Sequence, residues 1–134
     1  MSEQIAQRWL DDSAQTASAG NFSAHMNLIS KEVQVHGVPE FEVIGYQDWF
    51  NQCEHEFANN VLASLHYSGL KMIAATEQRV MFKTIEVSLT NEGEQSQSGV
   101  EVVLAKENDG QWRVIQERIL SDDETRHAGL PLGQ

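Results

Sequence analysis

Residues 99–120, GVEVVLAKENDGQWRVIQERIL, decide the fold. Val, Ile and Leu recur on both sides of an Asn-Asp-Gly triplet at 108–110, whose residues tolerate the positive φ angles of a tight hairpin turn. The stretch therefore predicts two antiparallel strands joined by a hairpin. Two stretches of similar composition precede it, near 61–75 and 79–90, so we expect a four-stranded antiparallel meander in the second half of the chain.

Helical periodicity dominates the first half of the chain. Apolar residues at helical spacing predict an amphipathic helix over 3–19, a shorter helix after Asn21 and an aromatic-rich helix over 46–59. Between the last two helices, residues 32–36 alternate in polarity and predict a short strand. Helices laid on one face of an antiparallel sheet make an α+β fold, and we expect the chain, residues 1–134, to form one such domain.

Charge and cysteine content exclude several classes of partner. Asp and Glu number 20 against 9 Lys and Arg, for a net charge of -11, so the surface repels nucleic acid and anionic membranes. Cys53 is the only cysteine, which rules out an internal disulfide and a thiolate metal cage. The N-terminus does not resemble a signal peptide, and no apolar run is long enough to span a membrane. We expect a cytoplasmic protein without a metal or other cofactor.

The last strand, near 112–120, carries apolar residues on both of its faces. One face of the sheet can pack on the helices, but the other face also needs a cover. A second copy of the chain is the simplest cover, so we predict a homodimer through the outer face of the sheet. Residues 121–134, SDDETRHAGLPLGQ, are mostly polar and are expected to form a tail.

Four short motifs carry a resemblance to a known superfamily. They are Gly-Asn at 20–21, VQVH at 33–36, GYQDWF at 45–50 and DGQWRVI at 109–115. With the order of the predicted elements over residues 3–121, the chain resembles the nuclear-transport-factor-2-like (NTF2-like) superfamily, and within it the SnoaL-like polyketide cyclase and ketosteroid isomerase branch.

The resemblance implies a cone, in which a curved sheet wraps around the helices and leaves an apolar pocket at its open end. Members of the superfamily use this pocket for isomerisation, dehydration, cyclisation or epoxide hydrolysis, or only to bind a ligand. The fold alone therefore does not settle the function, which has to be argued from the residues.

Two histidines are candidates for moving a proton. His36 ends the short early strand, where ketosteroid isomerase-like members place their aspartate base, and a neutral imidazole can accept a proton near neutral pH. His66 and Tyr67 point to opposite faces of their strand, so at most one of them lines the pocket. The alternatives are an exposed His36 and a structural, hydrogen-bonded His66.

The last strand supplies a candidate polar pair. If Trp112 points inward, as the resemblance implies, then Gln116 and Arg118 also point inward. A buried Arg118 needs an acidic partner, for which Glu86 and Glu101 are candidates, and such a pair can hold a carboxylate or enolate oxygen. The alternative is an arginine that packs its stem on the sheet and keeps its head in water.

Glu86 allows two interpretations. A carboxyl group on the pocket wall has a raised pKa and can serve as an acid or a base. However, Met81, Ile85, Val87 and Leu89 form the more apolar face of the same strand. We therefore favour a solvated Glu86.

The remaining pocket residues are mostly aromatic. The expected lining consists of Trp9, Phe22, His25, Trp49, Phe50, Phe82 and Gln116.

Two functions remain open at this point. One is acid–base catalysis on a small hydrophobic carbonyl compound, with His36 or His66 moving the proton and Arg118 steadying the oxygen charge. The other is a non-catalytic module for ligand binding or dimerisation. The sequence does not decide whether the protein is an enzyme.

Overall fold

The computed structural model describes residues 2–133. The elements in chain order are α1 (Ser2–Ser18), α2 (Phe22–Met26), β1 (Ile29–His36), α3 (Tyr46–Ala58), β2 (Leu62–Ala75), β3 (Arg79–Thr90), β4 (Gln95–Lys106), β5 (Trp112–Ile119) and α4 (Asp122–His127).

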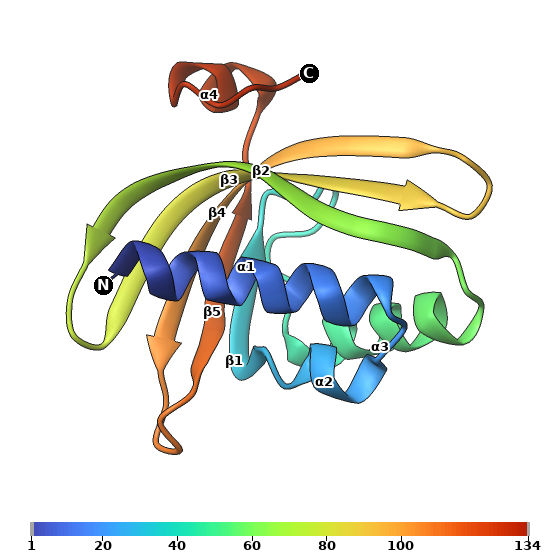
Figure 1. Cartoon of the computed structure of the whole chain (residues 1–134), viewed down its shortest axis with the longest axis horizontal. Helices are drawn as coiled ribbons and strands as arrows, with labels where there is room; N and C mark the ends of the chain where they lie inside the picture. Colours follow the sequence, from blue (N-terminus) through green and yellow to red (C-terminus); the bar gives the residue numbers. More distant parts are fainter. Residues whose placement is uncertain (1, 134) are drawn as a thin grey trace.

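The five strands form one curved sheet in the order β1-β5-β4-β3-β2 (Figure 1). Strands β2 to β5 are the predicted antiparallel meander. Strand β1 pairs with β5 in parallel, so the sheet is mixed rather than wholly antiparallel. The predicted α+β fold, with a curved sheet packed on N-terminal helices, is confirmed.

Helix α1 crosses the concave face of the sheet (Figure 1). Its buried residues fall on one stripe at helical spacing: Ala6, Trp9, Leu10, Ser13 and Ala17. They pack with sheet residues into one apolar core, whose fully buried members include Phe82, Val100 and Leu104. This core fills the region under the first half of α1.

The C-terminal segment is not a free polar tail. Ser121 and Glu124 form a capping box that starts α4, which lies on the opposite side of the sheet from α1 (Figure 1). Thr125 is fully buried against Gly99, where a side chain on residue 99 would collide with it. Leu130 packs on Ile85 and Val87 of the outer face. The polar composition of residues 121–134 gives no indication of these few buried contacts.

The segment after β5 therefore covers part of the outer face that motivated the predicted homodimer. Ile73 and Leu89 remain exposed on the sheet, at 44% and 38%. The homodimer stays a prediction, which a mass measurement in solution can test. Within residues 2–133, no helix has the length and apolar character needed to cross a membrane.

Candidate functional site

A cavity of about 920 Å³ lies between α3 and the concave face of the sheet. Its size suits a small organic molecule. Helices α1, α2 and α3, the loop before α3 and all five strands contribute to its wall. The residues with aromatic, titratable or hydrogen-bonding side chains on this wall include Trp9, Ser13, His25, Phe41, Asp48, Trp49, Cys53, Glu56, Phe57, Tyr67, Glu86 and Glu117.

A β-bulge in β5 decides which side chains reach this cavity. Val114 pairs with Leu104 and Gln116 pairs with Val103, so Ile115 has no partner on β4. One extra residue reverses the alternation of side chains along the rest of the strand.

As a result, Glu117 faces the cavity, and Gln116 and Arg118 lie on the other face of β5. The prediction that Gln116 and Arg118 point inward is wrong. It extended the phase of Trp112 through the bulge, where the sequence has neither Gly nor Pro to mark the irregularity.

Arg118 instead ties α4 to the outer face of the sheet. Its guanidinium donates to the Glu124 carboxylate at 2.9 Å and lies 3.4 Å from that of Glu101. The side chain is 33% exposed, so its charge is partly solvated. Arg118 therefore has a structural role outside the cavity.

Glu86 and Glu117 are the two carboxyl groups set deepest in the cavity wall. Glu86 stands on β3, with Tyr67 of β2 and Ser98 of β4 as its cross-strand neighbours. Glu117 stands on β5 and is only 9% exposed. Neither carboxyl group forms a hydrogen bond or ion pair with another residue of 2–133. No buried side-chain oxygen or nitrogen in this range lacks a partner, so the two carboxyl groups are open to the space of the cavity.

Burial favours the protonated form of both groups. It raises the pKa of Glu86 to about 7, and the charge of Glu56 adds to the effect. Burial also raises the pKa of Glu117 to about 8, with a further contribution from the charge of Glu86. The interpretation of Glu86 as a solvated residue is therefore wrong, because Ile85 and Val87 occupy the outer face and Glu86 the inner one.

Tyr67 places a phenol beside these carboxyl groups. Its hydroxyl is 2.9 Å from Ser13 Oγ of α1. Burial holds the pKa of Tyr67 well above its usual value, and the charge of Glu86 adds to the effect. The phenol therefore stays protonated and can donate a hydrogen bond at neutral pH.

Two other titratable side chains of the wall stay uncharged. Burial lowers the pKa of His25 to about 4, and its Nδ1 lies 2.8 Å from Thr16 Oγ1. Burial, with the charge of Glu56, raises the pKa of Cys53 to about 12. A neutral imidazole and an intact thiol are the forms present at pH 7, so Cys53 is not an activated nucleophile.

The two histidines proposed as proton carriers lie outside the cavity wall. His66 is exposed, because Tyr67 takes the inward position on β2. His36 is half-buried at the end of β1, where Val35 is the residue that faces the cavity. The structure thus moves the acid–base candidates from histidines to glutamates.

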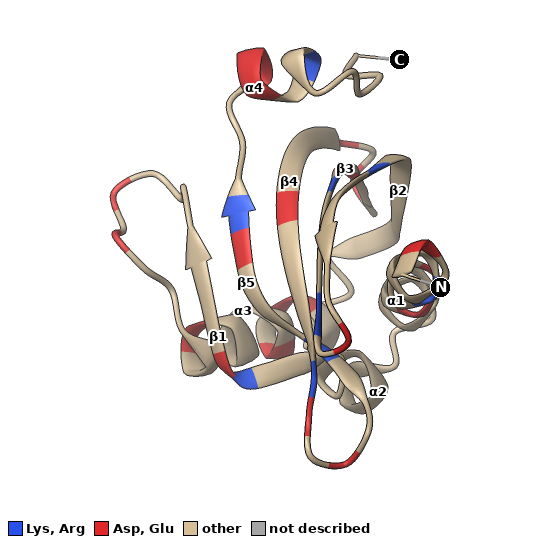
Figure 2. Ribbon diagram, turned by 90° about the vertical axis from the view of Figure 1, so that its left-hand side faces the viewer, with Lys and Arg blue, Asp and Glu red and all other residues tan. Residues whose placement is uncertain are grey.

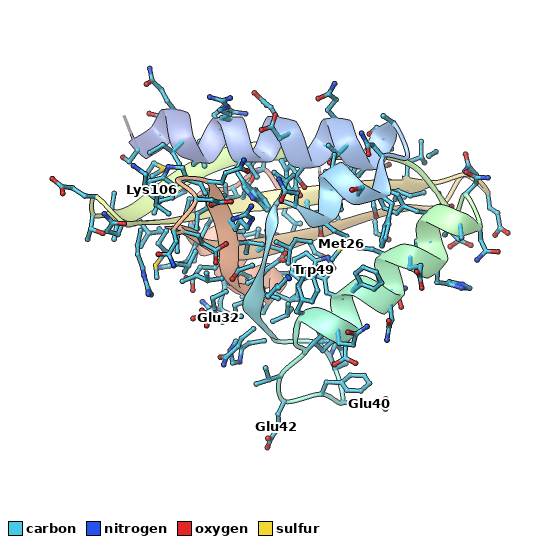
Figure 3. The ribbon with its side chains drawn as sticks, turned by 90° about the horizontal axis from the view of Figure 1, so that it is seen from below. Met26, Glu32, Glu40, Glu42, Trp49 and Lys106 are labelled. Carbon is cyan, nitrogen blue, oxygen red and sulfur yellow. The ribbon has the colours of Figure 1, made fainter. Side chains whose placement is uncertain are left out.

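The predicted aromatic lining is divided between the cavity and the core. Trp9, His25 and Trp49 line the cavity, and Figure 3 shows Trp49 between α3 and β1. Trp9 Nε1 is fixed by a 3.0 Å hydrogen bond to the carbonyl of Leu28.

The other three aromatic residues do not line the cavity. Phe22 and Phe50 pack edge to face at 5.1 Å between α2 and α3. Phe82 is fully buried in the core under α1. Among the described residues, no group of three or more His, Cys, Asp or Glu side chains is placed to hold a metal ion.

Comparisons with known proteins show the fold. No protein-family model matches the sequence, and no curated protein matches it either. An NTF2-like protein of unknown function from Shewanella oneidensis superposes with a TM-score of 0.74 at 10% identity, covering 89% of this chain and 98% of that one. ActVI-ORFA from Streptomyces coelicolor gives 0.70 at 10% identity, covering 90% and 97%.

A protein of unknown function with a cystatin-like fold from Nostoc punctiforme gives a TM-score of 0.66 at 9% identity, covering 87% and 88% of the two chains. These similarities extend over most of each chain. Because the identities are this low, they show a shared fold and nothing more.

Proposed function

Because the chain has the NTF2-like fold, we propose that its cavity binds a small hydrophobic carbonyl compound and that Glu86 and Glu117 move a proton on it. One observation carries the proposal: two carboxyl groups without protein partners face the same largely apolar cavity. Carboxyl groups with raised pKa values that face a cavity concentrate where a ligand or a reaction needs them.

Two carboxyl groups of different pKa on one cavity wall suit isomerisation or dehydration. An ionised carboxylate takes a proton from the carbon next to a carbonyl group, and the electron pair moves onto the carbonyl oxygen as an enolate forms. The carboxyl group that remains protonated then returns a proton to another carbon, or protonates a hydroxyl group that leaves as water. Each route conserves atoms and electrons and leaves one group protonated and one ionised with their roles exchanged, and proton exchange with water restores the starting state.

Tyr67 fits the role of stabilising the enolate oxygen. Its hydroxyl is held by Ser13, and its strand neighbour is Glu86. In acyl-transfer enzymes, removal of one fixed donor that faces the developing oxygen charge lowers the rate by about 100-fold or more. We therefore assign Tyr67 as the donor and the glutamates as the acid–base pair.

A non-catalytic ligand-binding protein is the second candidate function. Trp9, Trp49 and Phe57 supply a large apolar surface that can hold a ligand without any proton transfer. In that case the glutamates affect only the pH dependence of binding.

Hydrogen–deuterium exchange at carbon distinguishes the two candidates. The protein is incubated in D2O with cyclic ketones and enones, and deuterium at the carbon next to the carbonyl group is followed by NMR. We expect the wild-type protein to accelerate exchange and Glu86→Gln or Glu117→Gln to lower the rate by about 100-fold. His66→Gln, at an exposed position, is the matched control and keeps the wild-type rate.

Exchange at the buffer rate, with ketones that still raise the melting temperature, would establish the binding function instead. Exchange that persists in the double variant Glu86→Gln/Glu117→Gln would contradict the assignment of the proton carriers.

A further inference from the structure

The cavity wall carries several acidic side chains and no basic one. Asp48, Glu56, Glu86 and Glu117 line it, but no Lys or Arg among residues 2–133 does. Acidic positions are also frequent on α3 itself (Figure 2). The arginine predicted for the cavity, Arg118, is held on the outer face by Glu101 and Glu124.

We propose that the cavity selects an organic cation with an apolar body, such as a protonated arylalkylamine or a quaternary ammonium compound. The inference takes its location from the proposed function and adds the charge of the substrate. In catalysis, the corresponding substrate is a hydrophobic carbonyl compound that also bears an amino group.

Glu117 is the side chain that most needs such a partner. It is more than nine-tenths buried, it lines the cavity, and nothing in the described part of the chain pairs with it. A buried carboxylate is stable only when a cation or hydrogen-bond donors compensate for the lost hydration. An ammonium group in the cavity provides this compensation to Glu117.

Aromatic rings of the wall favour the same ligand. Trp9, Trp49, Phe57 and Tyr67 contribute to the cavity from three different elements. Ring faces attract organic cations, and tryptophan does so most strongly. An anionic ligand is repelled by the carboxylates of the wall, whereas a neutral ligand gains the apolar contacts and nothing from the carboxylates.

Binding of a cation is coupled to proton release. The cation stabilises the ionised forms of Glu86 and Glu117, which burial otherwise keeps partly protonated. The other titratable groups that face them are Asp48, Cys53 and Glu56 of α3, His25 of α2 and Tyr67 of β2. His25, Cys53 and Tyr67 are uncharged at neutral pH, so they do not oppose the cation.

Isothermal titration calorimetry with three benzyl probes of different charge tests the inference. The probes are benzyltrimethylammonium, its neutral isostere neopentylbenzene and the anion phenylacetate. At pH 8 we expect the ammonium probe to bind at least about tenfold more tightly than the isostere, since cation–π and charge contacts together exceed about 1.4 kcal/mol. Phenylacetate should bind more weakly than both.

The pH dependence and two double variants locate the effect. The preference for the ammonium probe should shrink at pH 5, because Glu86 and Glu117 are then protonated, while the probe itself cannot titrate. Glu86→Gln/Glu117→Gln should remove the preference and leave binding of neopentylbenzene intact. Glu54→Gln/Glu77→Gln removes two carboxyl groups from exposed positions and should keep the preference.

Equal binding of the ammonium probe and its isostere, or tighter binding of phenylacetate, would overturn the inference. Those results leave the deuterium-exchange test of the proposed function untouched. Conversely, a clear ammonium preference without any exchange at carbon would retain the cation site and refute the catalytic function.

Discussion

Tyr67 and Glu86 face each other directly across β2 and β3, and both side chains reach the cavity from the concave face of the sheet. The pairing sets a protonated phenol next to a carboxyl group whose pKa burial raises to about 7. A donor and a proton carrier are thus fixed by strand register, which is among the most rigid relationships in a sheet.

The first prediction concerns stability and pH. Glu86 and Glu117 have folded-state pKa values above the ordinary value of 4.5, so the folded protein holds more protons than the unfolded chain as pH rises from 4.5 through about 8. The free energy of unfolding contributed by these groups therefore falls over this range. Glu86→Gln/Glu117→Gln should flatten the fall and make the variant more stable than wild type at pH 8, as urea denaturation can measure.

The control for this prediction is Glu54→Gln/Glu77→Gln, which makes the same two substitutions at exposed positions. A wild-type protein that gains stability between pH 5 and pH 8, relative to the glutamine pair, would contradict the burial of ionisable groups in the cavity.

The second prediction tests how α4 is seated. Gly99→Ala places a methyl group where the Thr125 side chain lies. We expect a loss of about 1–3 kcal/mol, as for overpacked sites, and faster hydrogen exchange at the amides of α4. In Gly45→Ala the added methyl group meets no neighbour, so the loss in the free energy of unfolding should be only a few tenths of that for Gly99→Ala. Equal effects of the two substitutions would show that α4 is not packed on β4.

The third prediction tests the core under α1. Phe82 is fully buried, so Phe82→Ala should lower the free energy of unfolding by about 3–5 kcal/mol. Phe41, on the loop between β1 and α3, is 61% exposed. Phe41→Ala should therefore change the free energy of unfolding by less than about 1 kcal/mol. Figure 3 shows Glu40 and Glu42 of the same loop at its projecting tip. Similar losses from both substitutions would refute this placement of the core.

The fourth prediction is the homodimer through the outer face. Light scattering at micromolar concentration should give the mass of two chains of 15.0 kDa. Leu89 is exposed on this face, and Leu89→Glu should shift the mass to that of one chain by placing a charge in the interface. A monomeric wild-type protein would show that α4 and its ion pairs cover the sheet sufficiently.

Sequence periodicity predicted most of the fold because helices and hairpins are local. The Asn-Asp-Gly turn and the apolar stripe of α1 depend on neighbours within a few residues. The parallel pairing of β1 with β5 joins segments about 80 residues apart, and no local pattern specifies it.

The site was harder to predict for a specific reason. Residues 112–120 read as an unbroken alternation, so the bulge at Ile115 left no signal and the phase of Glu117 was inverted. Glu86 was misplaced because the apolar residues beside it, Ile85 and Val87, are covered by a polar-looking segment of the same chain. The sequence feature that pointed to the site was a single glutamate, Glu86 or Glu117, among the apolar residues of its strand.

The most direct test of the account is an NMR titration of the side-chain carboxyl carbons of Glu86 and Glu117. We expect both groups to titrate far above ordinary glutamates, with pKa values of about 7 and about 8, and the pKa of Glu117 to fall when Glu86 is changed to Gln. Titration of both groups near the ordinary value of 4.5 would mean that water solvates them freely, and the proposed proton-carrying pair would be refuted.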